Sequence, residues 1–202
     1  MALVNGEMER LEKFAGPLGQ VVQVFNIALL VILVALVCFV AFTILAPDQY
    51  FSGEGSDLAR LSFEFNGTLR YTISPTAVKA NVNLRGIYTS IAGAAIVYAL
   101  ILRLVLGNLK TIIHSVVIKQ PFDLRNRKRI LNISWAVMLS AFVIPAVNVW
   151  VTSQVIRTFD LQGFSAVYSP HANLIFVAFL LIVLAGVFAY GCHLQQEVDE
   201  TI

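Results

Sequence analysis

The segment "FNIALLVILVALVCFVAFTILA", residues 25–46, decides the fold because it is long enough and apolar enough to cross a bilayer. It lies within a longer stretch, residues 14–47, that contains no Asp, Glu, Lys or Arg. A helix needs about 20 mostly apolar residues to cross a hydrocarbon core of about 30 Å. A helix also satisfies its own backbone hydrogen bonds in lipid, which an open strand cannot do. We therefore predict that this segment is a transmembrane helix.

The composition of the whole chain extends this prediction to three further segments. The 202 residues are 58% hydrophobic and 13% charged, whereas soluble domains average about 45–50% apolar and about 25% charged residues. We predict an all-α membrane protein with four transmembrane helices, at about residues 24–46, 86–109, 130–152 and 172–193. The net charge of +2 gives no reason to expect an anionic partner.

The first span differs from a cleavable signal peptide. Its apolar run exceeds the roughly 7–15 residues of a signal h-region, and Glu7, Glu9 and Glu12 precede it. The segment "AGPLG", residues 15–19, is expected to break the helical pattern before the span.

The distribution of Lys and Arg predicts the orientation of the four spans. Both termini and the central loop share one side of the membrane, where nine of the 14 Lys and Arg residues lie, counting Arg103 just inside it. Because short cytoplasmic loops carry the excess of positive charge, we expect this side to be cytoplasmic. The expected parts are a cytoplasmic segment 1–20, a transmembrane domain 21–194, a cytoplasmic tail 195–202, a cytoplasmic loop 110–129, and extracytoplasmic loops 47–85 and 153–171.

The first extracytoplasmic loop contains the pattern of a β-hairpin. In "LARLSFEFNGTLRYTI", residues 58–73, apolar and polar side chains alternate on both sides of Asn66-Gly67. A three-residue connection of residues 65–67 would pair Leu61 with Tyr71 and Phe63 with Leu69, which leaves one face apolar. We expect a structural cap on the membrane domain, with a binding surface as the alternative.

The central loop holds the densest cluster of positive charge. The segment "QPFDLRNRKRILNISW", residues 120–135, contains Arg125, Arg127, Lys128 and Arg129. We expect Asp123 to be the N-cap of the next helix. Before it, residues 109–117 are expected either to continue the second span or to bend into an interfacial helix. Anionic headgroups attract such cations by about 1 kcal/mol each. Membrane orientation and lipid contact are the first interpretation, and a protein partner is the second. Direct nucleic-acid binding is not expected, because no recognisable module accompanies the run.

Small residues at helical spacing predict close helix packing. The second span has Ser90, Gly93 and Ala94, and the fourth has Ala185, Gly186 and Ala189. Such faces fit a compact four-helix bundle or docking against a larger complex.

The sequence contains no pattern that indicates catalysis. It has no Gly-rich phosphate loop, no serine triad order and no paired carboxylates at the ends of the spans. Its three histidines are scattered, and Cys38 and Cys192 form no framework. Cys192 and His193 could together bind a metal beside His114, but no metal, cofactor or enzymatic activity is expected.

Two short segments resemble a known family. The segment "PFDLRNRKRILNISW" and the C-terminal "GCHLQQEVDETI", residues 191–202, together with the four-span plan, resemble the YoaS-like domain-of-unknown-function family of bacterial membrane proteins. The resemblance rests on Pro121, Phe122, Asn126, Arg127 and Arg129 in the loop, and on Gln196, Glu197, Asp199, Thr201 and Ile202 in the tail. Glu200 stands where family members usually have leucine.

The resemblance implies a place and a kind of partner, but no established activity. It implies a bacterial inner membrane protein whose gene often lies beside the gene of a small helix-turn-helix regulator, which suggests that regulator as a partner. We therefore expect a non-enzymatic protein whose cytoplasmic face recruits such a partner, through contacts that also reach lipid headgroups. The expected contact residues are Phe122, Arg125, Asn126, Arg127, Lys128, Arg129, Glu197 and Asp199.

Other interpretations stay open beside this one. The chain could be an accessory subunit of a larger membrane complex, or a sensor or immunity protein for an envelope-acting peptide that adds to a strand edge. The acidic tail could pair with the basic run within one chain or between subunits of a homo-oligomer.

Overall fold

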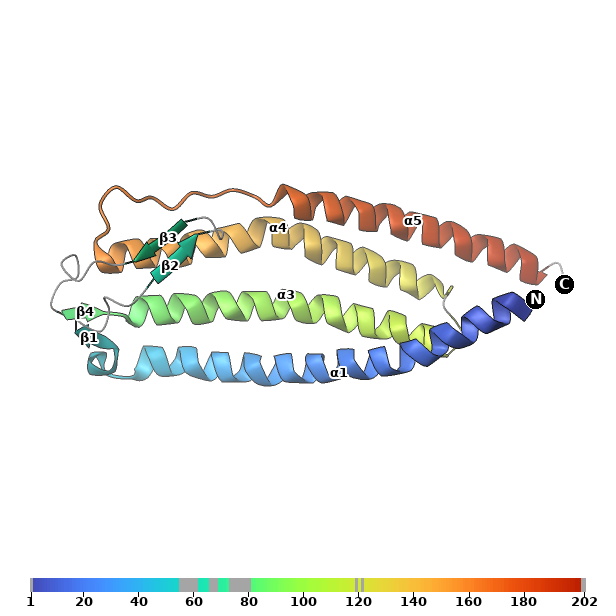
Figure 1. Ribbon diagram of the computed structural model, residues 1–202, viewed down its shortest axis with the longest axis horizontal. Helices are drawn as coiled ribbons and strands as arrows, with labels where there is room; N and C mark the ends of the chain where they lie inside the picture. The colour runs from blue at the N-terminus through green and yellow to red at the C-terminus, as the bar shows by residue number, and fades with distance from the viewer. Residues whose placement is uncertain are drawn as a thin grey trace. The chain divides into compact units, whose positions relative to one another are not determined.

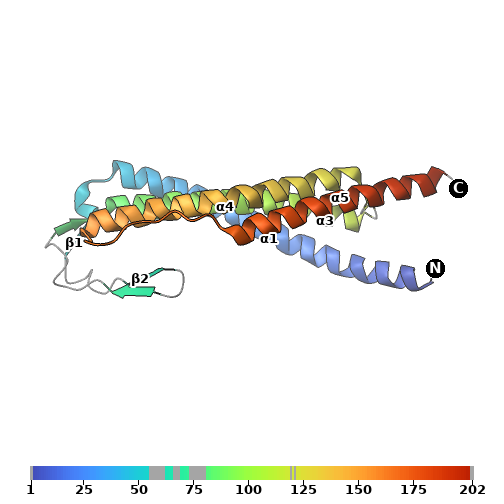
Figure 2. The same ribbon diagram turned by 90° about the horizontal axis from the view of Figure 1, so that it is seen from above.

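The computed structural model describes residues 2–54, 62–65, 69–72, 81–118, 120 and 122–200. Four long helices dominate it: α1 (Ala2–Leu45), α3 (Arg85–Val117), α4 (Leu124–Phe159) and α5 (Ala172–Glu200). Figure 1 shows each of them as one uninterrupted helix, and Figure 2 shows the same helices from above. Each contains a stretch long and apolar enough to cross a membrane: Ala15–Leu45, Arg85–Val117, Leu124–Phe159 and Ala172–Glu197. The predicted all-α architecture with four spanning helices is confirmed.

All four helices extend beyond the predicted spans, and α5 does so by continuing to Glu200. α1 continues through Pro17, so the predicted break at residues 15–19 is wrong. Helices in lipid tolerate proline because neighbouring groups satisfy the freed backbone carbonyl. α3 continues to Val117 as one helix, which is the first of the two expected alternatives. α4 ends at Phe159, several residues beyond the predicted end of the third span.

Two short antiparallel strand pairs lie between α1 and α3, after the 3-10 helix η1 (Asp48–Phe51). The predicted hairpin is present as β2 (Ser62–Phe65) and β3 (Leu69–Thr72), but its register is two residues away from the predicted one. Phe63 is opposite Tyr71 and Phe65 is opposite Leu69, so the predicted pairing of Phe63 with Leu69 is wrong. Leu61, Asn66 and Gly67 lie outside the described residues. The second pair, β1 (Ser52–Glu54) with β4 (Asn81–Asn83), was not predicted.

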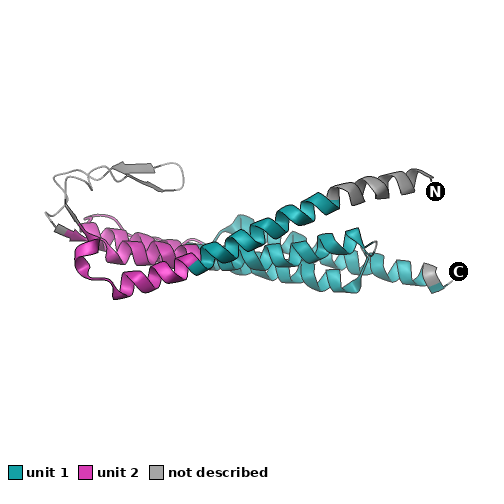
Figure 3. Cartoon of the chain, turned by 90° about the horizontal axis from the view of Figure 1, so that it is seen from below, with its two compact units in different colours: residues 1–34, 97–145, 170–202 teal, residues 35–96, 146–169 magenta. Residues whose placement is uncertain are grey.

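The chain forms two compact units, which Figure 3 distinguishes by colour. Unit 1 comprises residues 1–34, 97–145 and 170–202, and unit 2 comprises residues 35–96 and 146–169. α1, α3 and α4 each contribute residues to both units.

Unit 1 is held by small and aliphatic side chains. Ala15 and Val22 of α1 pack against Ile113 of α3 in one buried cluster. Where α4 meets α5, the buried Ser134 hydroxyl donates to the carbonyl oxygen of the fully buried Ala178 at 2.9 Å. Most other α5 side chains are exposed, as expected for a surface in contact with lipid.

Unit 2 joins the end of α1 to the start of α3. The Arg85 guanidinium donates to the carbonyl oxygen of Ala46, lies 3.3 Å from the Asp48 carboxylate, and stacks over the Phe51 ring at 5.2 Å. A buried cluster of Val82, Ile87, Val155 and Phe159 covers the last turns of α4. This cluster explains why α4 continues beyond the predicted span, because its final turns bury apolar side chains in the unit itself.

Candidate functional site

The basic run, which consists of Arg125, Arg127, Lys128 and Arg129, follows the connection between α3 and α4. Asp123 fixes the start of α4. The Asp123 carboxylate accepts a hydrogen bond from the Arg125 backbone N–H at 2.8 Å, which is the N-cap that the sequence predicted. The Arg125 Nε atom lies 3.0 Å from the same carboxylate. The pKa of Asp123 lies below its ordinary value, chiefly because of the backbone hydrogen bond and then because of the Arg125 charge. The carboxylate is therefore charged at neutral pH.

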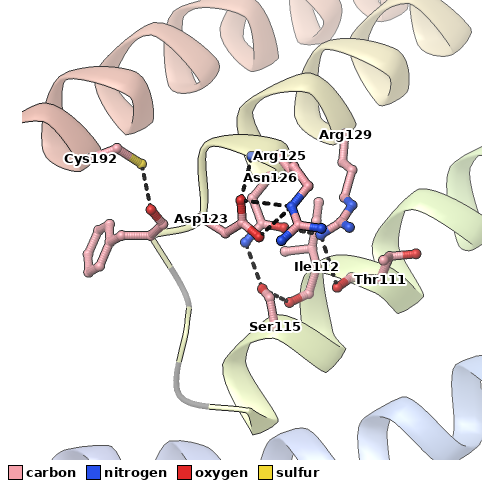
Figure 4. A network of polar contacts seen from close by, with 9 residues as sticks. Thr111, Ile112, Ser115, Asp123, Arg125, Asn126, Arg129 and Cys192 are labelled. Atoms are coloured by element: carbon pink, nitrogen blue, oxygen red, sulfur yellow. Dashed lines mark hydrogen bonds and ion pairs between the residues drawn. The ribbon is translucent and has the colours of Figure 1, made fainter.

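Asn126 is the most deeply buried polar residue of this region. Its side chain is completely buried, and its Nδ2 atom donates to Ser115 Oγ on α3 at 2.6 Å. Its Oδ1 atom accepts from Arg129 Nη1 at 2.6 Å. Figure 4 shows these groups converging between α3 and α4. Arg129, one turn after Asn126, is thus turned toward α3 rather than toward the surroundings.

The contact between α3 and α4 continues for two more turns. Arg129 Nη1 lies 3.5 Å from the Thr111 carbonyl oxygen, and Asn132 Nδ2 lies 3.4 Å from Asn108 Oδ1. Helical residues three or four positions apart share one face, so the polar groups follow one another along both helices. We call this set the polar ladder: Asn108, Thr111 and Ser115 on α3, and Asn126, Arg129 and Asn132 on α4.

The polar ladder divides the basic run into two groups. Asn126 and Arg129 are held inside it, while Arg125, Arg127 and Lys128 are exposed. Arg125 contacts Asp123. Arg127 and Lys128 have no hydrogen-bond or ion-pair partner among the residues that the structure describes. The contacts of Asn126 and Arg129 hold this face of α4 against α3, so the neighbouring positions 127 and 128 lie on exposed faces of the helix.

α5 packs against the same connection. The Phe122 ring stacks on Phe188 with ring centres 5.7 Å apart. The buried Cys192 thiol donates to the Phe122 carbonyl oxygen at 3.0 Å. A Cβ atom at Gly191 would lie 3.7 Å from the Phe122 ring, so α5 approaches this ring closely. Phe122 remains 51% exposed and offers an apolar surface five residues before Arg127 in the sequence.

The predicted contact between the tail and the basic run is not among the described interactions. Glu197 lies 3.8 Å from His193 on its own helix. The side chain of Asp199 and residues 121, 201 and 202 lie outside what the structure describes.

The two groups of small residues differ in their surroundings. Ser90 and Ala94 are buried, and a Cβ atom at Gly93 would lie 2.8 Å from Trp150 Cζ3 of α4. In α5, Ala185 is buried and Ala189 is half-buried, but Gly186 is exposed with no atom near its hypothetical Cβ. The hairpin residues Phe63, Leu69 and Tyr71 lie in β2 and β3.

The sequence analysis did not identify the three residues that α3 contributes to the polar ladder. Asn108, Thr111 and Ser115 follow helical spacing in an otherwise apolar segment, and this polar stripe was a signal that could have found them. Among the described residues, no group of three His, Cys, Asp or Glu side chains is placed to hold a metal ion.

One comparison with known proteins gives a match. The family model described as "Protein of unknown function (DUF2975)" matches residues 71–202, which include the polar ladder and all of α5. No curated protein and no solved structure matches the chain.

Proposed function

Because the chain belongs to this family of unknown function, we propose a role from its own geometry: it is a non-enzymatic, multi-pass protein of the bacterial inner membrane that docks a cytoplasmic protein on the α3–α4 connection. The partner carries an acidic contact surface that fits Arg127 and Lys128, with Phe122 as the apolar contact. A helix-turn-helix regulator is the partner that the family resemblance suggests.

One observation supports this proposal above the others. The polar ladder uses Asn126 and Arg129 to join α3 to α4, yet Arg127 and Lys128 project away from it without a described partner. Because these two cations are not engaged within the described chain, a carboxylate of a partner can pair with them without displacing an existing contact. An exposed aromatic ring, here Phe122 of the same connection, is typical of protein contact surfaces.

The test is the double charge reversal Arg127→Glu with Lys128→Glu in the full-length chain. The protein is purified from membranes in mild detergent, and co-purifying proteins are identified by mass spectrometry. We expect the variant to reach the membrane at the normal level and to lose its partner. Arg157→Glu is the matched control, because Arg157 is an exposed cation at the opposite end of α4. An unchanged set of co-purifying proteins in the double variant would refute the docking role.

The exposed Gly186 favours one alternative, an accessory subunit that packs on a larger membrane complex through α5. In that case the chain migrates with a large complex in native gels, and Gly186→Leu, but not the charge reversal, releases it.

A further inference from the structure

A second candidate site lies on α3, two turns and more before the basic connection. Leu100, Arg103, Leu104, Gly107 and Asn108 line an open hollow of about 360 Å³. All five residues belong to unit 1 and to the spanning segment of α3. The hollow ends at Asn108, whose amide oxygen accepts from Asn132 at the last rung of the polar ladder.

The floor of the hollow is bare backbone. A Cβ atom at Gly107 would meet no atom within 4 Å. A glycine in a helix interior is unfavourable compared with alanine, so its presence here needs a reason other than the packing of the chain on itself. A ligand can approach the α3 backbone closely at this position.

Two cations flank this floor. Arg103 lies one turn before Gly107, and Lys110 lies in the turn after it, about 10 Å from Arg103 along the helix axis. Their spacing places them on one side of α3. Neither has a hydrogen-bond or ion-pair partner within the described part of the chain, and both are half-exposed. An arginine within a spanning segment is costly unless an anion or water satisfies it.

The remaining wall is apolar and faces outward. Leu100 and Leu104 are 47% and 58% exposed. Exposed leucine side chains on a spanning helix contact acyl chains, and a negative group can pair with the cations one or two turns away, which lack a described partner. A free phosphate ion would pair with the cations but would leave the leucines without an apolar contact. A neighbouring apolar helix would contact the leucines but would leave the cations without a negative partner.

We propose that this hollow binds an anionic phospholipid, with its phosphate beside Gly107 between Arg103 and Lys110 and an acyl chain along Leu100 and Leu104. The lipid would lie in the leaflet that faces the α3–α4 connection. This proposal does not depend on the docking role, because it uses neither Arg127 nor Lys128.

The test measures lipid retention by the full-length chain in mild detergent, using native mass spectrometry. Phosphatidylglycerol and phosphatidylcholine with identical acyl chains are added in turn. We expect the wild-type chain to retain phosphatidylglycerol in preference. Arg103→Gln should lower this retention by about fivefold, the change expected when one cation near a lipid surface is lost.

Gly107→Leu tests the same site without changing its charge. The leucine side chain fills the hollow and should reduce phosphatidylglycerol retention, while the open space around Gly107 lets the chain fold normally. Arg103→Lys should retain the lipid, and Arg157→Gln, at a cation outside the hollow, should behave as wild type.

Three results would overturn the proposal. Equal retention of the two lipids, or normal retention in both Arg103→Gln and Gly107→Leu, would show that the hollow holds no anionic lipid. Displacement of phosphatidylglycerol by inorganic phosphate would show a simple anion site. Loss of folding in both variants would show that the hollow is a structural contact with another part of the protein or a second copy.

Discussion

At the scale of single residues, Asn126 holds Arg129 of the basic run toward α3, while its neighbours Arg127 and Lys128 stay exposed. Its amide donates to Ser115 and accepts from Arg129 while fully buried. Asn126→Ala would leave a half-buried guanidinium and the buried Ser115 hydroxyl without this partner, and an unsatisfied buried group costs roughly 1–3 kcal/mol. We expect a loss of that size in the free energy of unfolding, measured by denaturant titration in detergent micelles.

Lys128→Ala is the matched control for this prediction. Lys128 is exposed and lacks a described partner, and such surface substitutions usually change stability by less than about 0.5 kcal/mol. If Asn126→Ala proved as stable as Lys128→Ala, the polar ladder would not hold α3 and α4 together.

The sequence predicted the place of the basic run but not its division. The positive charges were treated as one group because their density indicates orientation, which is a property of the whole segment. The inward turn of Arg129 depends on which face of α4 meets α3, and that face is set by Ser115 and Thr111. A residue's own neighbours in the sequence do not contain this information.

At the scale of elements, Asp123 controls the first turn of α4. Its pKa is lower in the folded chain, so its contribution to stability is fully present above the ordinary value of 3.8 and is lost as the pH falls through the folded pKa. We expect Asp123→Ala to speed amide hydrogen exchange at residues 124–127 at neutral pH. Asp123→Asn should preserve slow exchange, since asparagine is also a good N-cap, and should lose the acid-dependent change. Equal exchange in all three proteins would contradict the cap.

The close approach of α3 to α4 at Gly93 gives a second prediction for elements. A Cβ atom there would lie 2.8 Å from the Trp150 ring, whereas one at Gly107 would meet nothing. Gly93→Ala should therefore displace the ring and shift its fluorescence, in a Trp135→Phe background that leaves Trp150 as the single tryptophan. Gly107→Ala should leave the emission unchanged. A normal spectrum for Gly93→Ala would show that the ring does not rest on this glycine.

The hairpin shows how far a sequence pattern determines an element. Alternation fixes which side chains share a face, but a shift of two residues leaves both faces unchanged. The predicted register and the observed one, with Phe63 opposite Tyr71, both keep one face apolar. Turn geometry selects between them, and a three-residue connection could be placed at either position. Predicted helix lengths were limited for a related reason: hydropathy marks the lipid-facing part of a helix and not the turns beyond it, such as the last turns of α4 that pack in unit 2.

At the scale of the whole molecule, the orientation of the chain decides which partners can reach the docking surface proposed on the α3–α4 connection. In unit 1, Cys192 near the end of α5 contacts Phe122, and Ala15 and Val22 near the start of α1 pack against Ile113 near the end of α3. Four spans therefore bring both terminal segments and the α3–α4 connection to one side. The excess of Lys and Arg on that side favours the cytoplasm.

Cysteine labelling in intact cells tests this orientation. In a Cys38→Ala, Cys192→Ala background, which removes both natural thiols, single cysteines are introduced by Arg127→Cys, Gln195→Cys and Ser165→Cys, all at exposed positions. A maleimide that cannot cross the inner membrane should label only Ser165→Cys until the cells are opened. The reason is that the spanning part of α4 lies between positions 127 and 165, and the spanning part of α5 lies between positions 165 and 195. Labelling of Arg127→Cys in intact cells would place the basic connection outside, where no cytoplasmic regulator could reach it. Opposite behaviour of Arg127→Cys and Gln195→Cys would instead show that one of the four helices does not span the membrane.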